Sequence, residues 1–171
     1  MIVAFDTSFL SLALKPDQPP PLDLETDKPV ERAHERVDAL INGFDSKGDL
    51  LIVPTPVLTE VLCVVPDVQK ALERLNRSSA ICFSAFDERA AIELALIERR
   101  AIADGTYKSG SSPRQKAKFD RHIATIAKVN GAERLYTDDK RMAAFARRIE
   151  LDVVHIEQLP MPPPEQTKCD L

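Results

Sequence analysis

Short apolar segments alternate along this chain with longer segments of helical pattern. The apolar segments are residues 2–5, 50–53, 80–83, 135–136 and 151–156. They are too short for buried helices and are rich in residues that favour strands. Strands separated by helices pair in parallel and are then buried on both faces. The pattern predicts an α/β fold of three layers, in which helices cover both sides of a mostly parallel sheet of four to five short strands.

The segments between these strands predict helices. A good N-cap candidate, Asp67, precedes one of them, and a glycine suited to a helix stop, Gly131, follows another. The expected helices are residues 7–14, 30–44, 57–65, 67–75, 86–103, 113–130 and 140–149.

The length of 171 residues suits one domain with a sizeable core. Prolines crowd residues 16–29, which excludes regular structure there and predicts a surface loop. Residues 160–171 are again rich in proline and poor in apolar side chains. We expect one domain over residues 1–159 and a C-terminal tail over 160–171.

Composition limits which cellular location and which binding partners we expect for the protein. The net charge of −4 means that a nucleic-acid partner must meet a local basic patch. Cys63, Cys82 and Cys169 form no CxxC spacing, which argues against a zinc cluster or a disulfide framework. The sequence shows neither a signal peptide nor an apolar run long enough for a membrane span. We therefore expect a cytoplasmic protein without a membrane partner.

Asp120 occupies an unusual position for a carboxylate. Helix neighbours three and four residues apart share a face, and those of Asp120 are Ala117, Ile123 and Ala124. The stripe that should enter the core therefore carries an ionisable group, which needs a cation, strong donors or a proton. Glu60 repeats the pattern, with Pro56, Val57, Cys63 and Val64 on its face. Either acid could instead be solvated or paired with a lysine or arginine at the rim of the core.

Other acids follow the predicted strands. Asp6 comes directly after residues 2–5, and Asp138 and Asp139 come just after residues 135–136. Ligands of open α/β sheets bind beyond the carboxyl ends of the strands. Helix capping is the alternative, equally acceptable for Asp138. For Asp6 we favour a functional role, because Thr7 and Ser8 supply other cap candidates.

Acids that converge on one edge of a sheet would repel one another at neutral pH. Hard divalent cations with oxygen ligands relieve this repulsion. Mg²⁺ or Mn²⁺ held by carboxylates can activate water and stabilise the oxyanions of phosphodiester hydrolysis. The residues thus predict a metal-dependent hydrolase.

These motifs together resemble the PIN-domain family, and more narrowly the VapC-like toxin ribonucleases. The resemblance is carried by residues 2–10 (IVAFDTSFL), 55–61 (TPVLTEV), 119–127 (FDRHIATIA) and 135–139 (LYTDD). It spans most of residues 1–156 with the motifs in the family's order. The loop at 16–29 and the tail are longer than in the compact toxins.

The resemblance implies site residues and partners. It assigns Asp6, Glu60, Asp120 and Asp139 as catalytic, metal-binding acids, with Asp138 as a neighbour that can join them. Thr7, Ser8 and Thr137 would orient substrate or water. The family implies Mg²⁺- or Mn²⁺-dependent cleavage of RNA, often by a homodimer and often inhibited by an antitoxin protein.

Basic residues surround Asp120. Arg114, Lys116, Lys118 and Arg121 could hold RNA phosphates, and binding would then weaken with salt. A solvated helix face is the alternative for this cluster.

Three other functions are alternatives to the ribonuclease. A catalytically silent PIN-like module that binds nucleic acid or protein is the main alternative. A receiver-like phosphoacceptor domain requires an acceptor aspartate after the third strand, where Asp87 is a weak candidate. Acid phosphatase-like chemistry requires the motif Asp-x-Asp after the first strand. The second aspartate of this motif is absent here, because position 8 is a serine.

Overall fold

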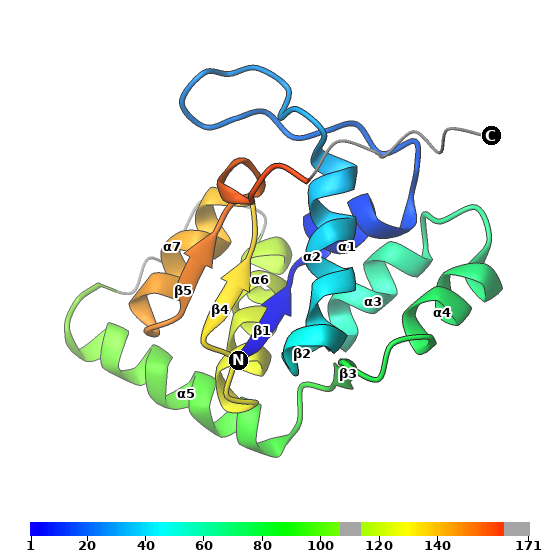
Figure 1. Cartoon of the computed structure of the whole chain (residues 1–171). Coiled ribbons are helices and arrows are strands. Elements are labelled where there is room, and N and C mark those ends of the chain that lie inside the picture. The colour runs from blue at the N-terminus through cyan, green and yellow to red at the C-terminus, as the bar shows by residue number, and fades with distance from the viewer. Residues whose placement is uncertain (107–113, 163–171) are drawn as a thin grey trace, which may run out of the picture.

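A computed structural model of the chain describes residues 1–106 and 114–162, except for the side chains of residues 114–116. Within this part the structure has one five-stranded sheet and seven α-helices (Figure 1). In chain order the elements are β1 (Ile2–Phe5), α1 (Thr7–Leu14), α2 (Ala33–Lys47), β2 (Leu50–Pro54), α3 (Thr55–Leu62), α4 (Val68–Asn76), β3 (Ile81–Ser84), α5 (Glu88–Ala103), α6 (Arg114–Val129), β4 (Arg134–Tyr136), α7 (Lys140–Arg148), β5 (Asp152–Val154) and the 3-10 turn η1 (Ile156–Gln158).

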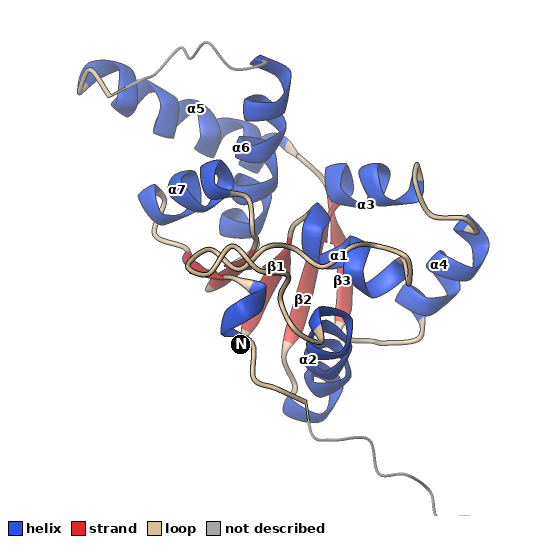
Figure 2. Cartoon of the chain, turned by 90° about the horizontal axis from the view of Figure 1, so that it is seen from above, coloured by secondary structure: helices blue, strands red, loops and turns tan. Residues whose placement is uncertain are grey.

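All strand pairs of the sheet are parallel, in the order β3-β2-β1-β4-β5. Figure 2 shows β1, β2 and β3 side by side with the same direction. The central strand β1 is buried on both faces, because the consecutive residues Val3, Ala4 and Phe5 point to alternate sides and are all inaccessible. The expected three-layer α/β fold with a parallel sheet is confirmed.

Aromatic rings fill the core behind the carboxyl end of β1. The Phe5 ring lies 5.3 Å from that of Phe9, 6.1 Å from that of Phe44 and 5.4 Å from that of Tyr136, measured between centroids. These residues come from β1, α1, α2 and β4. The cluster therefore holds four elements together directly beneath the sheet edge at which Asp6 lies.

Several boundaries differ from the expected ones. Helix α2 begins at Ala33 and not at residue 30, because Arg32 before it has a left-handed backbone with φ of 53°. Its end is not near Gly43 but at Gly48, which adopts the left-handed conformation that glycine tolerates best. Strand β5 covers only Asp152–Val154, and the chain then turns into η1.

The proline-rich segment 16–29 is a loop with one isolated bridge between Leu22 and Pro29, as expected for a segment without regular structure. Residues 163–171 of the predicted tail lie outside the described residues, so the domain bounds stay a prediction. No helix in the described part is long and apolar enough to cross a membrane.

Candidate active site

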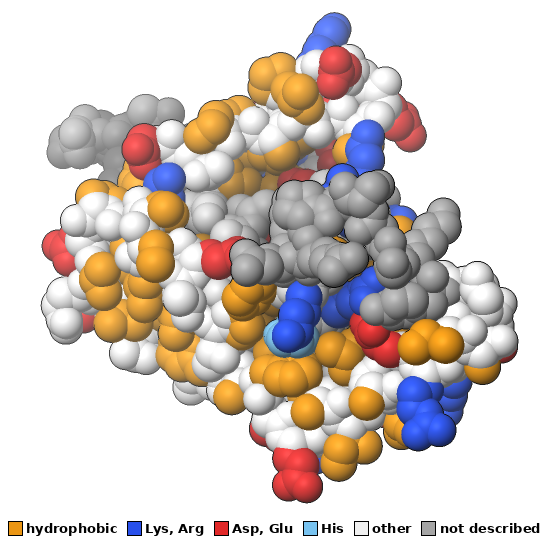
Figure 3. All heavy atoms as spheres, turned by 180° about the vertical axis from the view of Figure 1, so that it is seen from behind, with side chains coloured by type: hydrophobic (Ala, Val, Ile, Leu, Met, Phe, Trp, Pro, Cys, Tyr) orange, Lys and Arg blue, Asp and Glu red, His pale blue; other side chains and the backbone are white. Residues whose placement is uncertain are grey.

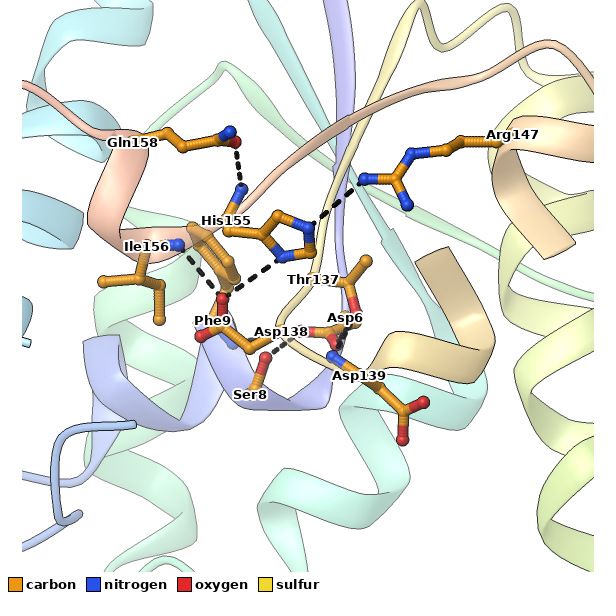
Figure 4. A network of polar contacts seen from close by, with 10 residues as sticks. All are labelled: Asp6, Ser8, Phe9, Thr137, Asp138, Asp139, Arg147, His155, Ile156 and Gln158. Atoms are coloured by element: carbon orange, nitrogen blue, oxygen red, sulfur yellow. Dashed lines mark hydrogen bonds and ion pairs between the residues drawn. The ribbon is translucent and has the colours of Figure 1, made fainter. Parts of the chain in front are cut away.

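Two neighbouring strands bring Asp6 and Thr137 together. Phe5 at the end of β1 pairs with Tyr136 at the end of β4, so the next residue of each strand leaves the same edge of the sheet. Thr137 is fully buried, and its Oγ1 donates to Asp6 Oδ2 at 2.5 Å. Figure 4 shows both side chains in one polar network. Parallel pairing thus joins residues that are far apart in the sequence.

The other oxygen of Asp6 caps α1. The Ser8 hydroxyl donates to Asp6 Oδ1 at 2.6 Å, and the Phe9 backbone N–H donates to the same oxygen at 3.1 Å. Asp6 is therefore the N-cap residue, and the expectation that Thr7 or Ser8 would cap this helix is wrong. Thr7 and Ser8 both lie within the first turn of α1. Capping uses only one oxygen of Asp6, so the carboxyl can also have a functional role.

Burial sets the charge state of Asp6. The side chain is only 3% exposed, and desolvation raises its pKa from 3.8 to about 6. Hydrogen bonds from Ser8, Thr137 and the Phe9 backbone oppose this rise, while the nearby Asp138 carboxyl adds to it. A carboxyl with a raised pKa at the ligand-binding edge of a parallel sheet is typical of a functional group.

Asp138 and Asp139 are directed to different partners (Figure 4). Asp138 Oδ1 accepts from the Ile156 backbone N–H at 3.0 Å and lies 3.6 Å from His155 Nδ1. Asp139 Oδ1 accepts from the backbone N–H groups of Arg141 and Met142 and caps α7. Asp138 thus anchors the start of η1, and the capping role considered for Asp138 belongs to Asp139.

The sequence reasoning missed His155. Its Nε2 lies 3.3 Å from Arg147 Nη2, and a guanidinium only donates, so Nε2 is the acceptor and the ring proton of the neutral form is on Nδ1, facing Asp138. The signal was available, because His155 directly follows β5 and so leaves the same edge of the sheet as Asp6.

Glu60 is linked to this edge through Thr7, whose hydroxyl donates to Glu60 Oε2. The Glu60 side chain itself is exposed, and Cys63 is exposed beside it. The helix α3 buries Val57 and Val61 instead. Of the two alternatives considered for Glu60, a buried acid and a solvated acid at the rim of the core, the structure shows the second.

Asp120 is buried, as expected from its stripe. It is 7% exposed on α6, and Ile123, Ala124 and Ala127 of the same helix are inaccessible. Helix α6 contacts α3, which carries Glu60, and α7, which Asp139 caps. The helices that carry the remaining acids thus meet around α6.

We tested whether these residues suit a divalent metal ion. Their donors are carboxylate and hydroxyl oxygens, the ligands that Mg²⁺ and Mn²⁺ prefer. Among the described residues, however, no group of three or more His, Cys, Asp or Glu side chains stands close enough together to hold an ion. The donor chemistry fits the metal, whereas a closed metal cage is not formed in this arrangement.

The basic residues proposed for phosphate binding have different surroundings. Lys118 is exposed on α6. Arg121 donates to Glu98 of α5 at 2.5 Å, and its guanidinium carbon lies 6.0 Å from the centre of the Phe145 ring. Arg114 and Lys116 belong to the first turn of α6, with side chains outside the described part.

Replacing Thr137 with valine is expected to lower the free energy of unfolding by about 1–3 kcal/mol. Valine keeps the shape but removes the donor of the buried hydrogen bond to Asp6 Oδ2 and the acceptor of the partly buried hydrogen bond from the Asp139 N–H. Urea unfolding at pH 7.5 measures the loss. Thr137→Ser retains the hydroxyl and serves as the control; equal stability of the valine variant and the wild type would contradict the expectation.

The chain was also compared with known proteins. No protein-family model matches the sequence, and no curated protein matches it either. A chain in the crystal structure of VapBC2 from Rickettsia felis, bound to a DNA fragment from the promoter of the two proteins, is similar with a TM-score of 0.57 and 14% sequence identity. The similarity covers 91% of this chain and 98% of that chain. The protein therefore has the α/β fold of a chain of a VapBC2 complex.

Proposed function

We propose that the protein is a divalent-metal-dependent ribonuclease that hydrolyses RNA phosphodiesters through Asp6, Glu60, Asp120 and Asp139. The observation that carries this proposal is the buried Asp6 carboxyl with its raised pKa at the carboxyl edge of the sheet. A buried carboxyl that is costly to ionise is the kind of group that a bound cation stabilises.

Each residue has a part in the proposed reaction. Asp6 and the other acids would hold the cation, and Thr137 and Ser8 keep the Asp6 carboxyl in one orientation by donating to its two oxygens. A bound Mg²⁺ or Mn²⁺ ion supplies Lewis-acid stabilisation of the phosphate oxygens and activation of water. Lys118 and Arg121, with Arg114 and Lys116, bind RNA phosphates. For Arg121 this requires exchange of its ion pair with Glu98.

We further propose that the ribonuclease is the toxin of a toxin–antitoxin pair. The similar fold in the VapBC2 complex supports this assignment. The partners are then an RNA substrate, an antitoxin protein and, in a homodimer, a second copy of the chain.

Cleavage of mixed RNA by the purified protein tests the proposed reaction. We expect cleavage with Mg²⁺ or Mn²⁺ and none with excess chelator. Asp6→Asn is expected to slow cleavage by more than about 100-fold, because even loss of a group behind a metal ligand costs about 10- to 100-fold. Asp17→Asn removes an exposed acid from the loop and is the matched control. Cleavage that survives both the chelator and Asp6→Asn would end the proposal.

A catalytically silent module that binds nucleic acid or protein is the second candidate. It is favoured by the lack, among residues 1–106 and 114–162, of three acidic side chains within reach of one ion. Calorimetric titration with Mn²⁺ distinguishes the two candidates. The ribonuclease binds Mn²⁺ and loses this binding in Asp6→Asn, whereas the silent module shows no difference between the two proteins.

A further inference from the structure

Three rings from α6 and the segment before α5 form a cluster at the surface. The rings of Phe86 and His122 stack with centroids 4.0 Å apart and planes inclined by 22°. Phe119 meets His122 edge-on at 6.2 Å. Phe119 is 47% exposed, whereas Phe5, Phe9 and Phe44 are in the core. An aromatic ring held in place by neighbouring rings and open to solvent has a face free for another flat ring.

The cluster lies at the same edge of the sheet as the candidate active site. Phe86 follows the carboxyl end of β3 at Ser84, and the parallel strands place this end at the edge that Asp6 leaves. Phe119 and His122 stand on either side of Asp120 in α6. A ligand on the cluster would therefore lie against the helix that carries Asp120.

Charge at the cluster suits a nucleic acid. Lys118 is exposed next to Phe119 in the chain. Lys118 and His122 are four residues apart in α6, so their side chains share one face of the helix and the Lys118 ammonium is near the stacked rings. On the rear face of the molecule, Figure 3 shows hydrophobic side chains close to Lys or Arg side chains. Single-stranded nucleic acid offers both a flat base for the rings and a phosphate for the ammonium.

We propose that Phe119, supported by His122 and Phe86, is a stacking platform for one unpaired base of single-stranded RNA, with Lys118 at the adjoining phosphate. The proposal rests on the ribonuclease function and makes single-stranded RNA the substrate class. Stacking on aromatic rings selects unpaired bases, because bases in a duplex are already stacked. The platform positions the strand beside the acids and takes no part in the chemical step.

Binding and cleavage of a fluorescein-labelled single-stranded RNA test the platform. Phe119→Ala is expected to raise the Kd by about 10-fold and KM similarly, with kcat changed by less than about twofold. Phe119→Trp keeps an aromatic face and is expected to bind at least as well as the wild type, whereas Phe119→Leu is expected to behave like the alanine variant. Ile102→Ala removes another exposed apolar side chain, from α5, and should change neither quantity. Lys118→Ala is expected to reduce the slope of log Kd against log salt by about 0.7.

The outcomes separate this proposal from the proposed function. Weaker RNA binding by Phe119→Ala in a protein that never cleaves would keep the platform and reject the nuclease. Normal cleavage, with Kd and KM unchanged in Phe119→Ala, would reject the platform and keep the nuclease. If Phe119→Ala lowered the affinity for duplex RNA as much as that for single-stranded RNA, the platform would also be overturned. If Phe119→Ala changed the mass measured by sedimentation and left the Kd for RNA unchanged, the rings would belong to a protein interface.

Discussion

Asp6→Asn is expected to stabilise the metal-free protein progressively relative to the wild type as the pH rises from 4 to 7.5. Because the folded-state pKa of Asp6, about 6, lies above the ordinary 3.8, folding penalises the ionised carboxyl. This penalty is absent below pH 3.8, where the carboxyl is protonated in both states, and complete above pH 6, where it is ionised in both. Asparagine does not titrate. Between pH 4 and 7.5, the free energy of unfolding of Asp6→Asn should therefore rise relative to that of the wild type by about 3 kcal/mol.

Urea unfolding in chelator at several pH values measures this difference. The constant cost of altered hydrogen bonds to Ser8 and Thr137 shifts the whole curve but not its dependence on pH. Asp17→Asn, in the exposed loop, is expected to give a flat difference. Addition of Mg²⁺ should stabilise the wild type and leave Asp6→Asn unaffected, because a ligand stabilises only the state that binds it. A pH-independent difference would show that burial does not raise the pKa of Asp6.

Phe5→Ala is expected to lower the free energy of unfolding by about 3–5 kcal/mol. Phe5 is inaccessible, and its ring contacts those of Phe9, Phe44 and Tyr136, so truncation leaves a cavity among four elements. Urea unfolding at pH 4, where Asp6 of the folded protein is mostly protonated, avoids the pH range in which burial of an ionised Asp6 destabilises the fold.

Phe83→Ala is the matched control for this cavity. Phe83 is the same residue type in the edge strand β3, but it is 40% exposed, and its truncation should cost less than about 1 kcal/mol. Equal costs for the two variants would contradict the assignment of the ring cluster as the centre of the core.

Local patterns were sufficient for much of the fold. The apolar segments became the five strands, since a short run of strand-forming residues between helices has few other ways to be buried. The stripe of Asp120 was correctly predicted to be buried, because helical spacing alone places Ile123 and Ala124 on its face. The position of Asp6 directly after β1 also follows from the strand itself.

The side-chain partners of the acids could not be predicted in this way. The sequence does not state how far a helix is rotated about its axis, so it left open whether Glu60 lies in the core beside Val57 or is solvated. The structure buries Val57 and Val61 and exposes Glu60. It also does not state which of two adjacent aspartates turns towards a distant residue. The structure turns Asp138 to the N–H of Ile156 and leaves Asp139 to cap α7.

The sequence by itself therefore determined the class of fold, the order of its elements and the edge of the sheet to which Asp6 belongs. These follow from hydrophobic periodicity, which is a property of neighbours along the chain. Only the tertiary structure decided the hydrogen bond between Asp6 and Thr137, the contact of His155 with Asp138 and the stack of Phe86 on His122. Each of these joins separate elements, and its existence depends on strand register and helix rotation, which are set by side-chain contacts across the whole core.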